Sequence, residues 1–84
     1  MKTLRVFRSG LEVLKVSLQG KSLQVKGNPN LTKSLGTEGV LEPHSGRNIQ
    51  VPQQLEGEEA PTIFAALYAH FQRASAYTID LDET

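Results

Sequence analysis

The side chains best suited to chemistry stand together in one short stretch of this sequence. His44, Ser45 and Arg47 fall within five residues that also contain Pro43 and Gly46. A glycine-containing turn of this kind can bind an anion or hold a catalytic histidine. No acidic partner stands at a spacing that would support acid–base catalysis, and residues of these types are common in polar turns. We therefore interpret the stretch as a polar loop tip.

This interpretation predicts that the chain is not an enzyme. The remaining catalytic hypothesis is an accessory subunit that lends His44 and Arg47 to a site shared with another chain. Metal and cofactor chemistry has little support, because His44 and His70 are far apart and there is no cysteine. Asp80 and Asp82 would share one side of a strand, but two carboxylates make a weak cation site. We expect no metal and no cofactor.

Charge is divided unevenly along the chain, although the net charge is zero. Residues 1–33 hold seven lysines and arginines against one glutamate, a net charge of +6. Residues 34–84 hold two against eight acidic residues, a net charge of −6. Such asymmetry indicates either a surface for a polyanion or two parts that neutralise each other across the fold.

Three strands are predicted in the basic third of the chain, over residues 2–7, 11–18 and 22–26. A loop of Gly20-Lys21 would place Leu18 opposite Leu23 and Val16 opposite Val25; a loop of Gln19-Gly20 would instead place Val16 opposite Leu23. The apolar phase of the second strand changes near Val13-Leu14, which predicts a bulge or bend. The predicted inner face is Leu4, Val6, Leu14, Val16, Leu18, Leu23, Val25, Ile79 and Leu81.

The opposite face of these strands would carry basic residues around one aromatic residue. This is the composition of single-stranded nucleic-acid platforms. One aromatic residue is a poor stacking platform, however, and the neutral net charge argues against this function. We also expect Asp80 and Asp82 to pair with Lys15 or Lys26 across strands. The residues of this nucleic-acid alternative are Arg5, Phe7, Lys15 and Lys26.

A helix is predicted over Ala60–Ser75, with Pro61 in its first turn and acidic residues before it. At 100° per residue its core stripe is Ile63, Phe64, Leu67, Phe71 and Ala74. The opposite stripe has small side chains, which either reflect helix propensity or allow a second surface to approach closely. That predicted protein-interaction face is Thr62, Ala65, Ala66, Ala69 and Arg73.

The other segments complete an α+β fold. Asn30 would cap a short turn over residues 31–35, residues 40–42 and 48–51 would form a weak hairpin, and residues 53–57 would lead into the helix. We predict one domain, residues 1–84. It has a small antiparallel sheet of about four to six strands, with one helix from the C-terminal half on one face and the order β-β-β-(β-β)-α-β.

These features favour a small cytoplasmic protein–protein interaction module: an adaptor, a regulator or an inhibitor of a larger protein. The chain lacks the parts of an active site, and the small-residue helix stripe and unpaired sheet edges offer docking surfaces. The expected partner is another protein or a second copy of this chain. No apolar run approaches the length of a membrane span.

Overall fold

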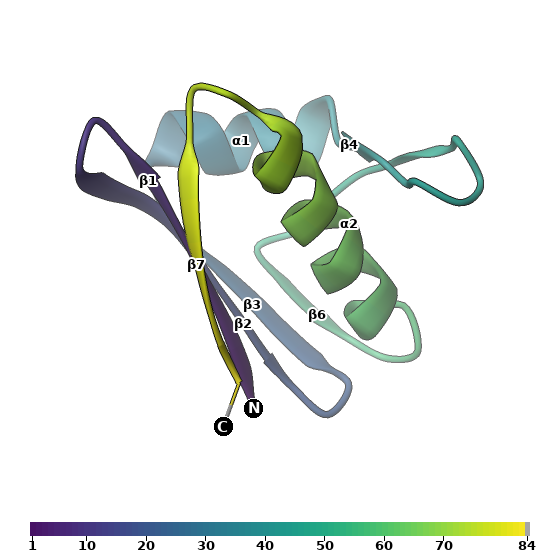
Figure 1. Ribbon diagram of the computed structural model, residues 1–84. Coiled ribbons are helices and arrows are strands. Elements are labelled where there is room, and N and C mark those ends of the chain that lie inside the picture. Colours follow the sequence, from purple (N-terminus) through teal and green to yellow (C-terminus); the bar gives the residue numbers. More distant parts are fainter. Residues whose placement is uncertain (84) are drawn as a thin grey trace.

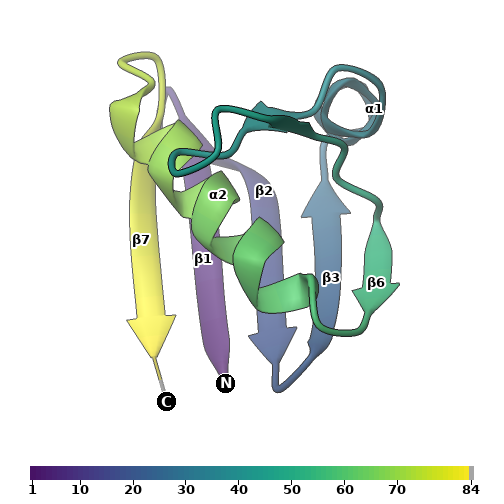
Figure 2. The ribbon, with the colours of Figure 1, turned by 90° about the vertical axis from the view of Figure 1, so that its right-hand side faces the viewer.

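The computed structural model describes residues 1–83 and is an α+β fold, as predicted. In chain order the elements are β1 (Lys2–Arg8), β2 (Leu11–Gln19), β3 (Ser22–Gly27), α1 (Pro29–Thr37), β4 (Val40–Leu41), β5 (Asn48–Ile49), β6 (Gln54–Glu56), α2 (Ala60–Arg73) and β7 (Thr78–Glu83). The main sheet is antiparallel with the strand order β6-β3-β2-β1-β7. Helix α2 lies across one face of this sheet, and α1 lies at one end of it (Figures 1 and 2).

The register of the three central strands follows the apolar pattern. Leu18 pairs with Leu23 and Val16 with Val25, which confirms the Gly20-Lys21 loop. The β1–β2 register shifts where β1 passes from Val6 to Phe7, so that Val13 is left as the extra residue of a bulge. The change of apolar phase in the sequence is therefore a real feature of the strand.

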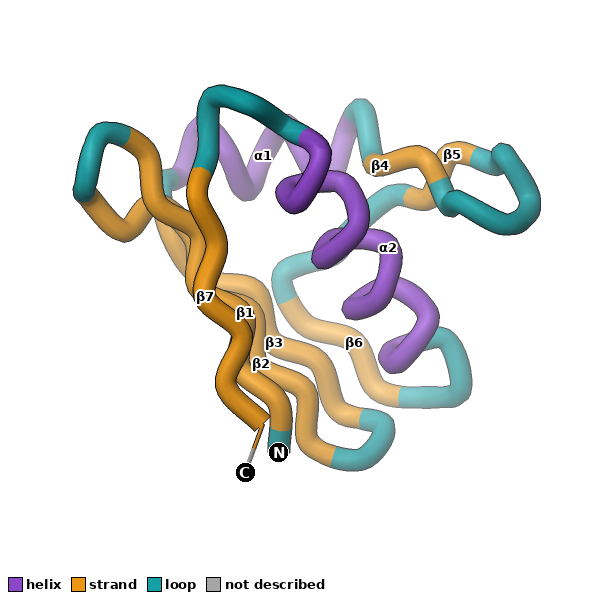
Figure 3. The backbone as a smooth tube through the Cα atoms, viewed as in Figure 1, coloured by secondary structure: helices purple, strands orange, loops and turns teal. Residues whose placement is uncertain are grey.

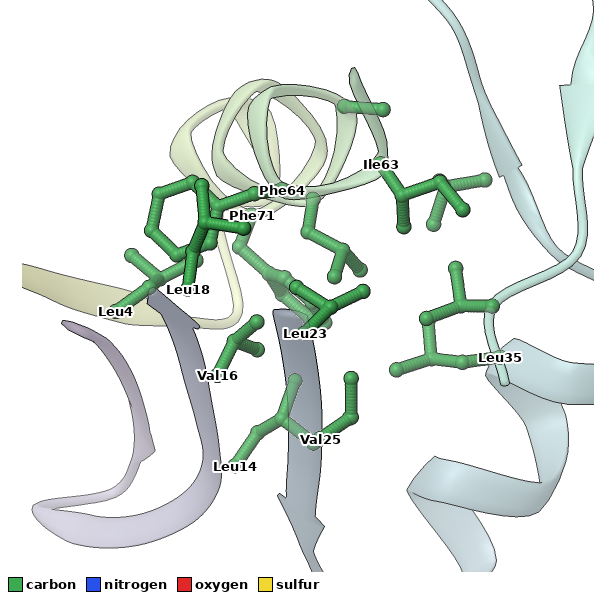
Figure 4. Packing of buried hydrophobic residues seen from close by; sticks show 14 of the residues in the cluster. Leu4, Leu14, Val16, Leu18, Leu23, Val25, Leu35, Ile63, Phe64 and Phe71 are labelled. Carbon is green, nitrogen blue, oxygen red and sulfur yellow. The ribbon is translucent and has the colours of Figure 1, made fainter. Parts of the chain in front are cut away.

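The core lies between the inner face of the sheet and α2 (Figure 4). All seven predicted inward residues of β1, β2 and β3 are buried, while Ile79 and Leu81 on the edge strand β7 are half-buried. Helix α2 contributes Ile63, Phe64, Leu67 and Phe71 of the predicted stripe. Ala74, its fifth predicted member, is half-buried, because the helix ends at Arg73 rather than at Ser75 and Ala74 is its extended C-cap residue. Burial of large apolar side chains of this kind stabilises the fold by roughly 1.5–3 kcal/mol each before the entropy cost of ordering them.

Two segments differ from the prediction. The turn expected at residues 31–35 is the longer helix α1, and its N-cap is Asn28, whose side-chain oxygen accepts a hydrogen bond from the backbone N–H of Asn30 at 2.9 Å. Pro29 then occupies the first turn, where no N–H is needed. The stretch expected only to lead into the long helix forms β6, whose Leu55 pairs with Leu23 at the sheet edge.

Strands β4 and β5 pair with each other, as predicted, but form a second sheet of two strands rather than joining the main one. They lie beside α2 and project away from the main sheet (Figure 3). Gly39 sets this geometry, because it has φ +77° and its backbone passes against the carbonyl of Ile49. Both the positive φ and the close approach exclude a side chain there.

Replacement of Gly39 should therefore destabilise the protein more than replacement of a glycine that has the positive φ alone. Gly20 is the matched control: its φ is +61°, and a side chain there would meet no atom within 4 Å. We expect Gly20→Ala to cost about 1 kcal/mol and Gly39→Ala at least about 2 kcal/mol in free energy of unfolding, measured by urea denaturation. Equal costs would show that the contact with Ile49 imposes no constraint.

Candidate functional site

Helix α2 and the turn between β4 and β5 enclose a groove of about 430 Å³. One wall consists of Thr62, Ala65, Ala66 and Ala69, and Pro61 lies at the start of the same helix. The other wall is the turn itself. It is formed by Glu42, Pro43 and His44. Four of the five residues of the predicted small-residue face, all except Arg73, thus form one side of a largely apolar groove.

The members of that predicted face lie in different environments. Thr62, Ala65 and Arg73 are exposed and Ala69 is half-buried. Ala66 is 1% exposed, so the expectation that it points outward is wrong. It lies at the floor of the groove because β4 packs against α2 on that side. The periodicity of the helix sequence alone does not predict that β4 and β5 pack beside the helix.

Glu42 organises the turn that forms the second wall. Its two carboxylate oxygens accept hydrogen bonds from the backbone N–H groups of His44 at 3.0 Å and Ser45 at 2.7 Å. The Glu42 N–H donates to the carbonyl of Arg47 at 2.8 Å, and the Gly46 N–H donates to the carbonyl of Glu42 at 2.9 Å. The Ser45 hydroxyl and the two N–H groups hold the pKa of Glu42 at about 2.

The hydrogen bonds of Glu42 argue against the hypothesis that the turn binds an anion. The N–H groups of His44 and Ser45 that would receive an anion already bind the carboxylate of Glu42. The side chains of His44 and Arg47 are exposed. Glu42 was not predicted from the sequence to organise the turn. An acceptor side chain just before a Pro-His-Ser-Gly turn was the available signal.

The face of the main sheet opposite α2 carries the predicted basic residues. Arg5 pairs with Lys15, and Lys15 pairs with Lys26, so the three cations lie in one row across β1, β2 and β3. Phe7 is half-buried on the same face and lies opposite Glu12 and Thr78. The structure therefore brings together the four residues of the nucleic-acid alternative on one face.

The acidic residues of β7 do not neutralise this row in the predicted way. Because β7 pairs with β1, Asp80 lies opposite Arg5 and Asp82 opposite Thr3. The expectation that they pair with Lys15 or Lys26 is wrong. Arg5 also forms an ion pair with Glu12 at 3.4 Å.

The other predicted positions carry little chemistry. His70 is half-buried on α2, with its ring edge-on to Phe71 at 4.9 Å between centroids. Burial, and then the nearby charge of Arg73, lower its pKa, which favours the neutral ring. Within residues 1–83, no group of three or more histidine and carboxylate side chains is arranged to hold a metal ion. Neither helix of this part of the chain has the length and apolarity to cross a membrane.

Comparison with models of known protein families, with curated proteins and with solved structures gave no significant match to this chain.

The low pKa of Glu42 makes a pH-dependent prediction. Its pKa falls from 4.5 to about 2 on folding, so its carboxylate stabilises the fold fully above pH 4.5, and this stabilisation is lost as the pH falls toward 2. Glu42→Gln should therefore lower the Tm at pH 7, and its difference from the wild type should shrink as the pH falls below 4.5. Thermal unfolding followed by circular dichroism measures both.

Glu56 on β6 provides the matched control, because it is an exposed carboxylate outside the turn. Glu56→Gln should leave the Tm close to that of the wild type at every pH. A Tm difference for Glu42→Gln that stays constant from pH 7 to pH 3 would contradict the assigned role of its carboxylate.

Proposed function

We propose that this protein is a small cytoplasmic interaction module without catalytic activity of its own, which binds another protein through the groove between α2 and the β4–β5 turn. The observation that carries the proposal is the groove itself. Two different elements form its walls, and its volume is about 430 Å³. The adaptor, regulator and inhibitor roles are all ways of using such a surface.

The chemistry of the walls indicates what would enter the groove. Alanine methyl groups and the rings of Pro43 and Pro61 line most of it. The charged group in the lining, the carboxylate of Glu42, is already bound to backbone N–H groups of its own turn. An apolar side chain of a partner protein is therefore the complementary group, because it would bury apolar surface on both sides.

The fold holds both walls of the groove in place. The helix wall rests on the core through Leu67 and Phe71, and hydrogen bonds within the Glu42–Arg47 turn fix the other wall. A site with walls held in place loses less conformational entropy on binding than a flexible loop would.

A photo-crosslinking amino acid at position 65, introduced in the organism that makes the protein, tests this proposal. We expect a crosslinked protein that disappears when Ala69→Glu is added, because a carboxylate would be placed in an apolar contact. The same crosslinker at the exposed position Lys33 on α1 is the matched control. Circular dichroism should show that Ala69→Glu remains folded. Ala66→Glu is unsuitable, since it would place a charge in the core.

Light scattering over a wide concentration range then identifies the kind of partner. A dimer that Ala69→Glu dissociates would mean that the groove binds a second copy of this chain. A monomer that crosslinks from position 65 but not from position 33 would mean a different protein. Equal crosslinking from both positions, or crosslinking unaffected by Ala69→Glu, would contradict a role for the groove.

Nucleic-acid binding is the second candidate, and the row of Arg5, Lys15 and Lys26 supports it. A charge contact with phosphates weakens steeply with salt. If this function is correct, a short oligothymidylate should bind at 20 mM salt, and its affinity should fall on going to 200 mM. Fluorescence anisotropy measures this, and absence of binding even at 20 mM salt would eliminate the candidate.

A further inference from the structure

Two lysines on the open face of the main sheet lie directly opposite each other. Lys15 on β2 and Lys26 on β3 are paired across the strands, and both are exposed. Arg5 on β1 is the next residue in the same row. Like charges placed directly opposite in a sheet repel each other and destabilise it. The register sets this juxtaposition, and a counter-charge between the two ammonium groups would relieve the repulsion.

The structure neutralises one end of the row and leaves the other uncompensated. Arg5 has Glu12 at 3.4 Å and lies opposite Asp80. Within residues 1–83, neither Lys15 nor Lys26 forms an ion pair. An external anion is therefore the available counter-charge for this pair.

The lysine pair lies at one end of a trough of about 320 Å³ between β2 and β3. The remaining lining is mostly hydroxyl and amide side chains, which can donate or accept hydrogen bonds but carry no charge. These residues are Ser17, Gln19, Ser22 and Gln24, with Met1 beside them. The side chains of the trough therefore place positive charge at one end and neutral hydrogen-bonding groups along the rest of its length.

We infer that this trough binds an acidic segment of a partner protein, with a carboxylate between Lys15 and Lys26 and polar groups of the segment along Ser17 and Gln24. The inference rests on the proposed function, because it gives the interaction module a second contact surface and specifies the charge of the segment bound there. The groove beside α2 and this trough lie on opposite sides of the sheet, so one partner could wrap around the edge or two partners could bind independently.

The same observations disfavour a nucleic-acid strand as the occupant. A strand carries one phosphate per nucleotide, so it needs cations along its whole path. Here the positive charge is local, and Asp80 and Asp82 on β7 lie on the same face. Phe7 supplies one aromatic ring, which is half-buried, whereas single-strand platforms stack successive bases on several rings.

Three labelled probes compared by fluorescence anisotropy test the inference: an octapeptide with two adjacent glutamates among serines, the same peptide with glutamines, and an octathymidylate. At 20 mM salt the glutamate peptide should bind most tightly. Lys15→Gln and Lys26→Gln should each weaken its binding by about three- to tenfold, as loss of a charge-assisted hydrogen bond at an exposed site predicts. Lys33→Gln, which removes an exposed lysine from α1, is the matched control and should change nothing.

A charge reversal separates binding from stability. Lys26→Glu would face Lys15 with an opposite charge, so it should raise the Tm while abolishing binding of the glutamate peptide. Ala69→Glu in the groove should leave peptide binding unchanged, which keeps this test independent of the groove. The inference would be overturned by equal losses for Lys33→Gln, by tighter binding of the octathymidylate, or by no peptide binding at 20 mM salt.

Discussion

The register of β1, β2 and β3 is the constraint on which the rest of this structure depends. It places Leu4, Val16 and Val25 in one row that is buried beneath α2. A slip of one residue in either pairing would turn the apolar set of a strand toward water. Each of these residues is followed or preceded in sequence by a cation: Arg5, Lys15 and Lys26. When the first row is buried beneath α2, the alternation of side chains therefore places the three cations in a row on the other face of the sheet.

Much of the fold follows from local sequence pattern. The strand alternation, the Gly20-Lys21 turn and the apolar stripe of α2 are each encoded within a few residues of one another, and the structure has all three. Two features that were not predicted, strand β6 and the separate β4–β5 sheet, depend on contacts between distant segments. Strand β6 has three residues and owes its conformation to pairing with β3. The β4–β5 pair forms its own sheet because Gly39 directs the chain beside α2, a consequence of a close approach to Ile49.

The candidate site likewise combines features that local sequence predicts with features that depend on contacts between distant segments. The small side chains of Ala65 and Ala69 could be recognised from helical spacing, and so could their separation from the core stripe. The groove could not, because its second wall comes from a turn some twenty residues earlier in the chain. The burial of Ala66 reflects that wall.

On the open face, sequence alternation predicted which side chains would project together, but the neighbour of each cation depended on strand order. With β7 beside β1, Asp80 faces Arg5, and the lysines on β2 and β3 lie farther along the same row, separated from Asp80 by β1.

The uneven charge of the chain can now be interpreted physically. Two of the ion pairs join the basic first third to the acidic remainder, Lys2 with Glu83 at 3.9 Å and Lys21 with Glu58. These pairs are exposed and contribute little stability, roughly 0–1 kcal/mol each. Neutralisation across the fold is thus real but weak, and it occurs at the periphery of the sheet. At its centre the register sets Lys15 opposite Lys26, and β1 separates both lysines from the acidic strand β7. The aspartates of β7 at one edge and the lysines of β2 and β3 in the middle make the open face dipolar, and such a face orients an anionic partner toward the central strands.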